Sequence, residues 1–138
     1  MPASVLIGDS ILNCYLRGVV PVPPVRLWVS LHTADPTVTG ANEVSLSAWP
    51  AYKRVDPSFG GLIDTAFTPS SGKLTANAQR MEYGIMDGPV PLVITHFALW
   101  NALVGGQMYI YGALDVSKTL APSDECVINP SKLQATVI

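Results

Sequence analysis

The side chains that could carry acid–base or nucleophilic chemistry are few in this sequence. Its two histidines, His32 and His96, are the bases available to activate a serine or cysteine nucleophile. The sequence has no Gly-x-Ser-x-Gly motif, which presents the nucleophile in many hydrolases. Both histidines occupy strand-like positions, where a ring hydrogen-bonded to backbone has a structural role. We therefore predict no catalytic residue and no enzymatic activity.

Metal and cofactor sites are not expected either. Zinc sites usually contain closely spaced ligand pairs, whereas Cys14 and Cys126 lie far apart and are expected to be free, buried thiols. Calcium requires several carboxylates in one loop, and Asp35 and Glu43 share their loop with no other acid. The glycine pairs Gly60-Gly61 and Gly105-Gly106 lack the sequence context of a phosphate-binding loop. Four aspartates could in principle pair for glycoside hydrolysis, but all lie at strand ends or turns: Asp56, Asp64, Asp87 and Asp115.

The composition suggests a protein that is largely covered by other proteins. Charged residues make up 13% of the chain, and hydrophobic residues make up 49%. The charged share is about half of that in an ordinary soluble domain. We therefore expect permanent association, beginning with copies of the chain itself as a dimer or higher oligomer.

Two other partner classes are excluded by the same composition. The net charge is −2 and the eight basic residues are scattered, so no nucleic-acid partner is expected. A membrane-spanning helix needs about 20 apolar residues in a row. Asp9, Asn13 and Arg17 interrupt the first apolar stretch, and the N-terminus lacks the basic region of a signal peptide. We therefore expect no membrane partner, and assembly in the cytoplasm of the host cell.

Aromatic side chains are the best candidates for contact residues. Tryptophan and tyrosine are enriched in protein cores and at interface anchors, although exposed tryptophans can also form a stacking platform for sugars. The residues we expect at an interface are Trp28, Trp49, Trp100, Tyr109 and Tyr111.

One helix is predicted, from about residue 4 to residue 17. Ser4 is a plausible N-cap and Gly18 is well placed to end the helix. The apolar residues on one helical face are Val5, Ile11, Leu12, Tyr15, Leu16 and Val19. Three prolines then exclude helix over residues 19–25, which should be extended.

The rest of the chain shows strand periodicity with turn residues between the strands. The predicted strands are 26–32, 52–55, 62–67, 79–84, 92–100, 108–116, 125–128 and 133–138. No second helix separates them, which excludes parallel βαβ units. We predict a single domain over residues 1–138 that is mainly all-β. Its fold is expected to be a two-sheet antiparallel β-sandwich of jelly-roll type over about residues 26–138, preceded by the N-terminal α-helix.

Two strands are apolar on both faces. In residues 92–100 and 108–114 the apolar side chains fall on both sides of the strand, so both sides must be covered. One cover is the opposite sheet. The second cover is either the N-terminal helix or a neighbouring subunit, and the sequence leaves both open.

Several blocks of the chain resemble a group of small structural proteins of tailed bacteriophages, often labelled tail-fibre proteins. The blocks are Leu31-His32-Thr33-Ala34-Asp35-Pro36, Thr39 to Ser45, Ile94 to Trp100, Gly105-Gly106, Tyr111 to Leu114, and Ser117-Lys118-Thr119 with Asp124. The chain is also similar in size and strand pattern to jelly-roll cement proteins that decorate phage capsids. It departs from the group in residues 50–61 and 87–91.

The resemblance implies a structural protein of the virion, with no catalytic residues and no cofactor. Its partners would be the major capsid protein or other virion proteins. Because the chain is compact and lacks repeats or heptads, we favour a capsid cement or decoration protein that bridges capsid subunits. The alternatives are a tail or tail-fibre component, and a carbohydrate-binding module for host recognition.

Overall fold

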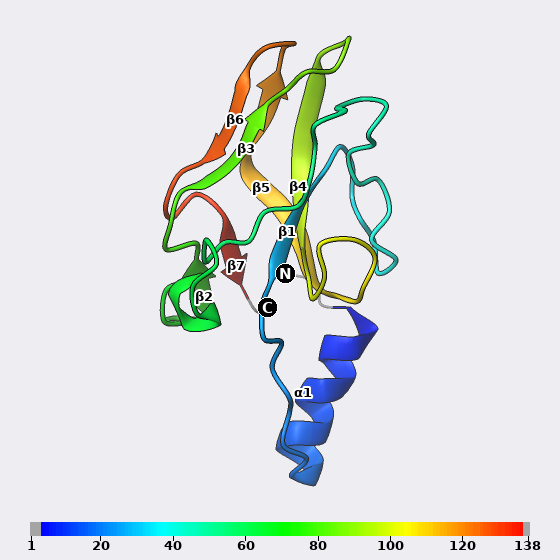
Figure 1. Ribbon diagram of the computed structural model, residues 1–138. Coiled ribbons are helices and arrows are strands. Elements are labelled where there is room, and N and C mark those ends of the chain that lie inside the picture. The colour runs from blue at the N-terminus through cyan, green and yellow to red at the C-terminus, as the bar shows by residue number, and fades with distance from the viewer. Residues whose placement is uncertain (1–3, 137–138) are drawn as a thin grey trace.

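The computed structural model describes residues 4–136 and is mainly β (Figure 1). Within these residues a single α-helix precedes seven strands, all of them paired antiparallel. The elements are α1 (Val5–Arg17), β1 (Trp28–His32), a short 3₁₀ helix (Ile63–Thr65), β2 (Leu74–Ala76), β3 (Met81–Ile85), β4 (Leu92–Trp100), β5 (Met108–Leu120), β6 (Glu125–Ile128) and β7 (Gln134–Thr136).

Helix α1 has the ends that the sequence predicts. The side chain of Ser4 accepts a hydrogen bond from the backbone N–H of Ile7 at 3.3 Å, as an N-cap does. Gly18 adopts a left-handed conformation with φ of 69°, and its N–H donates to the carbonyl of Cys14. The helix projects from one end of the β-rich body, and the chain then runs back along it into β1 (Figure 1).

The body consists of three small open sheets. The largest has the order β1-β4-β5, and the other two are the pairs β2-β7 and β3-β6. Side chains of the β1-β4-β5 sheet and of the β3-β6 pair meet in one hydrophobic core. Tyr83 of β3 spans this core, because its hydroxyl donates to the carbonyl of Val29 at 3.0 Å. The buried members of the core include Val29, Leu31, Trp49, Met81, Met86, Ile94, Phe97, Leu99, Cys126, Ile128 and Leu133.

The prediction of eight strands in a two-sheet jelly roll is not confirmed for residues 4–136. The predicted strand at 52–55 is wrong, because this segment makes only one isolated bridge, from Val55 to Val29. The predicted strand at 62–67 is also wrong, since its centre forms the 3₁₀ helix. Strand β2, at residues 74–76, was not expected. The mainly antiparallel β class and the N-terminal helix are confirmed.

The second face of β4 is covered by a loop, which neither of our two expectations included. Ala98, Trp100, Met108 and Tyr111 form a second hydrophobic cluster on this face. The long loop after β1 lies over it, and Gly40 sits so close to the Trp100 ring that a Cβ atom there would overlap it. The loop therefore covers the second hydrophobic cluster without a contribution from helix α1 or from a neighbouring subunit.

Candidate assembly interface

The predicted contact residues do not form one surface. Trp49 is 0% exposed in the main core, and its indole N–H donates to the carbonyl of Ile85 at 2.9 Å. Trp100 and Tyr111 are buried in the second cluster. Trp28 packs against that cluster, and it and Tyr109 are half-buried. Among these five residues, only Trp28 and Tyr109 thus keep substantial surface in the subunit, and their contact with a partner stays a prediction.

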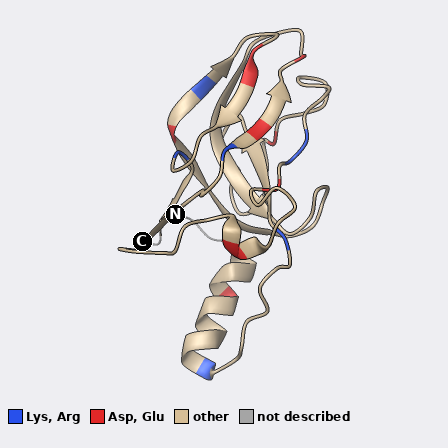
Figure 2. Cartoon of the chain, turned by 60° about the vertical axis from the view of Figure 1, so that its left-hand side comes forward, with Lys and Arg blue, Asp and Glu red and all other residues tan. Residues whose placement is uncertain are grey.

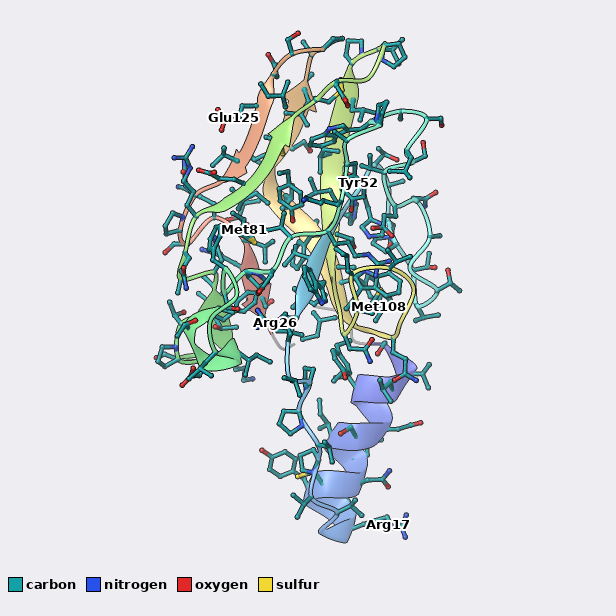
Figure 3. The ribbon with its side chains drawn as sticks, viewed as in Figure 1. Arg17, Arg26, Tyr52, Met81, Met108 and Glu125 are labelled. Atoms are coloured by element: carbon teal, nitrogen blue, oxygen red, sulfur yellow. The ribbon has the colours of Figure 1, made fainter. Side chains whose placement is uncertain are left out.

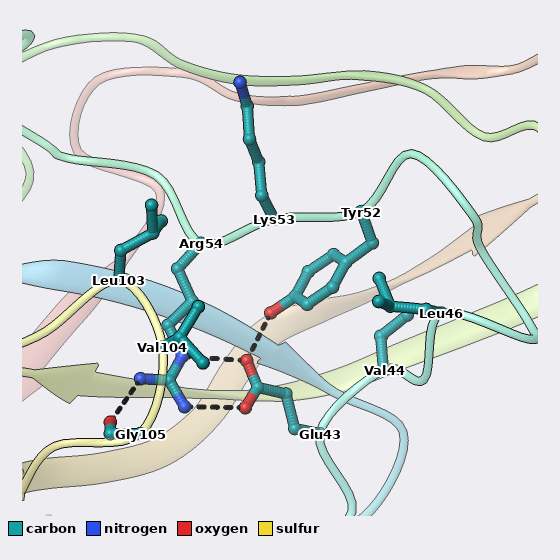
Figure 4. Close-up of a pocket in the computed structure, with 9 residues that line it drawn as sticks. All are labelled: Glu43, Val44, Leu46, Tyr52, Lys53, Arg54, Leu103, Val104 and Gly105. Carbon is teal, nitrogen blue, oxygen red and sulfur yellow. Dashed lines mark hydrogen bonds and ion pairs between the residues drawn. The ribbon is translucent and has the colours of Figure 1, made fainter.

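A buried polar cluster joins three loops beside the second hydrophobic cluster (Figure 4). We call Glu43, Tyr52 and Arg54 the loop clamp. The Arg54 guanidinium donates to both carboxylate oxygens of Glu43, at 2.9 and 2.8 Å. It also donates to the carbonyls of Ala102 and Gly105, at 3.0 and 2.8 Å, and lies 4.0 Å from the Trp100 ring centroid. Arg54 therefore links the segments around residues 43, 54 and 102–105.

The loop clamp has no free group for chemistry. The Tyr52 hydroxyl accepts from the N–H of Leu31 and donates to Glu43 at 2.9 Å. Burial alone raises the pKa of Glu43, but hydrogen bonds from Arg54 and Tyr52 bring that pKa below its ordinary value. Burial, and then the Glu43 charge, raise the pKa of Tyr52. The clamp is an ion pair between the Arg54 guanidinium and the Glu43 carboxylate, with the carboxylate oxygens occupied by hydrogen bonds, which indicates a structural role.

His32 is also fully engaged within the fold. Its Nδ1 lies 2.7 Å from the carbonyl of Ala41, and its Nε2 lies 2.7 Å from the hydroxyl of Ser30. The same hydroxyl accepts from the indole N–H of Trp100. Burial lowers the pKa of His32 from its ordinary value, which favours the neutral form of the ring. His32 therefore orders the loop after β1 over the second cluster.

The remaining candidates for chemistry stay apart. Within residues 4–136, no group of three His, Cys, Asp or Glu side chains is placed to hold a metal ion. Cys14 and Cys126 are both free, and burial raises the pKa of Cys126 to about 11, which disfavours the reactive thiolate. No helix in this part of the chain is both long and apolar enough to cross a membrane. Charged side chains are sparse along the ribbon (Figure 2).

The most unusual surface is the N-terminal arm, which we define as helix α1 with the return segment, residues 18–25. No residue of the helix is buried. Tyr15 is 83% exposed, Leu16 is 76% exposed and Leu12 is 56% exposed. The side chains of the arm extend into open space, with Arg17 at the end farthest from the body (Figure 3). A contiguous apolar surface of this kind marks an interaction site.

The return segment adds to this apolar surface. Val20, Val22 and Val25 are almost fully exposed, and the prolines between them keep the segment extended. A cleft of about 690 Å³ separates the return segment from helix α1, where Leu6, Ile7 and Ser10 line it. The arm is joined to the body near β5, because the N–H of Ser4 donates to the carbonyl of Tyr109 at 2.9 Å.

A second open surface is a groove of about 520 Å³ beside the start of β1. Trp28, Lys53 and Phe59 line it with Arg26. Phe59 is 53% exposed and has a φ of 52°, a conformation that costs a non-glycine residue about 1 kcal/mol. The turn is fixed by Asp56, which accepts hydrogen bonds from the N–H groups of Ser58 and Gly60, at 2.8 Å each.

Sequence reasoning missed both the loop clamp and the exposure of the arm. Glu43 and Arg54 are eleven residues apart in segments without regular structure, so no periodicity connects them. The apolar face of the helix was visible in the sequence. An amphipathic pattern is the same, however, whether the covering surface belongs to the same chain or to another.

A family model described as "Podophage GP4 fiber I protein gp80" matches residues 2–136, nearly the whole chain. No curated protein matches the chain.

Proposed function

Because this chain belongs to the Podophage GP4 fiber I protein gp80 family, and is therefore a structural protein of the phage virion, we propose that its N-terminal arm holds it in a tail fibre. The family is one of non-enzymatic phage fibre proteins, in line with the absence of a catalytic motif from the sequence. The proposal concerns how the subunit is attached.

The family corrects our preference for capsid cement. We favoured cement because the chain is compact and has no heptads or repeats. The family is one of fibre proteins, so the alternative reading, a tail-fibre component, is the supported one. The compactness argument failed because the length of an assembly is set by how many subunits it contains and how they join. The shape of one subunit does not limit it.

The observation that carries the proposal is that helix α1 buries none of its residues and leaves its large apolar side chains exposed. An isolated helix of 13 residues is marginal in water, and most helical stability in proteins comes from packing an apolar face. Helix α1 packs no buried residue against its own body. The surface that would stabilise it must then come from other virion proteins, copies of this chain among them.

Particle assembly tests the proposal directly. The phage lacking this gene would be complemented with the wild-type chain or with a Leu12→Asp, Leu16→Asp variant. We expect the variant to be at least tenfold depleted from purified particles, measured by quantitative mass spectrometry, because two buried charges would oppose docking. The matched control is Val104→Asp, an exposed apolar position on the body. Normal incorporation of the arm variant would refute the proposal.

A second candidate function is binding of a host saccharide in the groove beside β1. The specific observation is Phe59, an aromatic residue held in a left-handed conformation at the rim of a groove that also contains Trp28. Aromatic rings present flat apolar faces on which a sugar ring can stack. Lys53 lines the same groove and forms no ion pair within residues 4–136. The groove is also lined by the carboxylates of Asp56 and Glu82, which pair with Arg26 and Arg80. Lys53 is thus the charge left for a ligand, and a saccharide that carries a carboxylate fits it.

A glycan array tests this second function. Wild-type protein is expected to bind acidic glycans, and both Trp28→Ala and Phe59→Ala should abolish the signal. Val116→Ala, an exposed apolar position outside the groove, is the control and should bind as wild type does. If no acidic glycan binds, or if the two aromatic variants bind normally, the groove is not a saccharide site.

A further inference from the structure

The exposed face of helix α1 has a regular composition. With 3.6 residues per turn, Val5, Gly8, Leu12 and Tyr15 follow one another along a single face. Ile11 and Leu16 lie on its two sides. We call these six residues the exposed stripe, and its five side chains larger than glycine are all exposed. The opposite face, with Leu6, Ile7 and Ser10, lines the cleft toward the return segment.

Gly8, in the middle of the exposed stripe, is not explained by the chain's own structure. It lies inside the helix and its φ is not positive, so the backbone does not require glycine there. A Cβ atom at Gly8 would meet nothing within 4 Å, so no neighbouring group in the chain requires it either. Glycine inside a helix costs about 1 kcal/mol relative to alanine. A glycine that is costly and not required within the chain indicates that another backbone approaches closely at this point.

The exposed stripe is suited to its own copy. It carries no charge, so a second stripe meets it without leaving an ionised group unpaired. Of the charged residues of the helix, Arg17 lies on the opposite side, and Asp9 lies at the edge of the stripe beside Leu16, where its exposed carboxylate can stay in water. A helix with a small residue at the centre of an apolar face permits the close approach of two identical helices.

The area of the exposed stripe reaches the lower limit of a specific interface. The exposed fractions correspond to about 600 Å² of accessible surface on the stripe, so two stripes together offer about 1,200 Å². Specific interfaces bury about 1,200–2,000 Å² over both partners. Val20 and Val22 of the return segment lie across the cleft from the helix and are not counted in this contact.

We propose that the exposed stripe packs against the same stripe of a second copy of this chain, with Gly8 at the point of closest approach. This deepens the proposed function, on which it rests for the arm being an assembly element, by naming the occupant. The contact makes the helix a shared element of the oligomer, and its apolar residues become buried only there.

Cysteine cross-linking tests which helical face is shared. In a Cys14→Ser background, Leu12→Cys places a thiol on the stripe and Ser10→Cys places one on the opposite face. Native Cys126 stays buried in the body. With a short bismaleimide at micromolar protein, we expect cross-linked dimer for Leu12→Cys and at least tenfold less for Ser10→Cys. Equal yields, or none from Leu12→Cys, would overturn the proposal.

Gly8 provides an independent measurement. Light scattering should show an oligomer for wild type, and Gly8→Leu should weaken its association constant at least tenfold, since the added side chain separates the helices. Gly8→Leu raises helix propensity, so a folding defect of the helix cannot produce this result. Association that is unchanged or tighter would refute the proposal. A wild-type monomer that still depends on the arm for particle incorporation would refute self-pairing and leave the proposed function intact.

Discussion

Replacing Arg54 with methionine removes the centre of the loop clamp while keeping an apolar side chain over Trp100. Four hydrogen bonds are lost, two to Glu43 and one each to the carbonyls of Ala102 and Gly105. Removing one partner of a buried ion pair costs about 3–5 kcal/mol. The Glu43 side chain is 25% exposed and can recover some hydration, so we expect a loss of about 2–4 kcal/mol.

Urea denaturation followed by tryptophan fluorescence measures this loss, at one fixed protein concentration because oligomers dissociate on dilution. The chain contains its own control, the pair formed by Arg80 and Glu82, whose side chains are 52% and 51% exposed at a separation of 3.5 Å. Arg80→Met should cost no more than about 0.5 kcal/mol.

A double-mutant cycle separates the ion pair from the two carbonyl contacts. Glu43→Gln alone should lower the free energy of unfolding by about 1–2 kcal/mol. This is less than for Arg54→Met, because Arg54 keeps its hydrogen bonds to the carbonyls of Ala102 and Gly105. The coupling between the two substitutions should be about 1–3 kcal/mol. If Arg54→Met destabilises the protein no more than Arg80→Met does, the loop clamp contributes nothing to stability and our account of it is wrong.

Three further predictions concern stability. The free energy of unfolding should fall as the pH drops below about 6.5. The pKa of His32 is lowered in the folded state, so the unfolded chain takes up the proton first and is favoured. Urea denaturation midpoints measured across this pH range test the prediction. The free energy of unfolding should fall further below about 4.5, where the contribution of Glu43, whose pKa is also lowered, is lost; a flat profile from pH 7 to 4 would contradict both assignments. Gly40→Ala should lower the free energy of unfolding by more than about 2 kcal/mol in thermal denaturation, since φ is 73° and the added Cβ overlaps the Trp100 ring. The control Gly8→Ala should not lower the stability of the folded subunit. Asn77→Ala should cost about 2–3 kcal/mol by urea titration, because its buried amide bonds the backbone of Gln79, Asn129 and Leu133, and a loss under 0.5 kcal/mol would contradict this.

The sequence predicted elements whose pattern is local. Helix α1 has its cap residues at both ends, and β4 and β6 have the predicted bounds, because their periodicity and turn residues lie within each segment. Residues 62–67 failed since Leu62, Ile63, Ala66 and Phe67 suit one turn of helix as well as a strand. Residues 52–55 failed because the backbone N–H of Tyr52 closes a turn onto the carbonyl of Trp49, and only Val55 pairs with β1.

The contact residues and the association of the chain with its own copies stay predictions. The apolar side chains of the predicted helix face are exposed in the subunit, as a surface for a partner requires. Among the aromatic residues expected at an interface, Trp49 and Trp100 fill the two hydrophobic clusters of the subunit. Burial of an aromatic ring depends on long-range packing that residue type does not encode, whereas the spacing of residues on a helix depends only on the helix itself.

The arm is attached to the body at both of its ends. Ser4 bonds the backbone of Tyr109 at one end, and Arg26 pairs with Asp56 at the other. The 13 residues of the helix rise about 20 Å, and eight extended residues return about 25 Å, so the two limbs are nearly equal in length. A pull on a docked arm is therefore divided between two parallel limbs, each with its own attachment point. The return limb continues covalently into β1, so loss of the Ser4 hydrogen bond at the helical end would leave a docked subunit tethered.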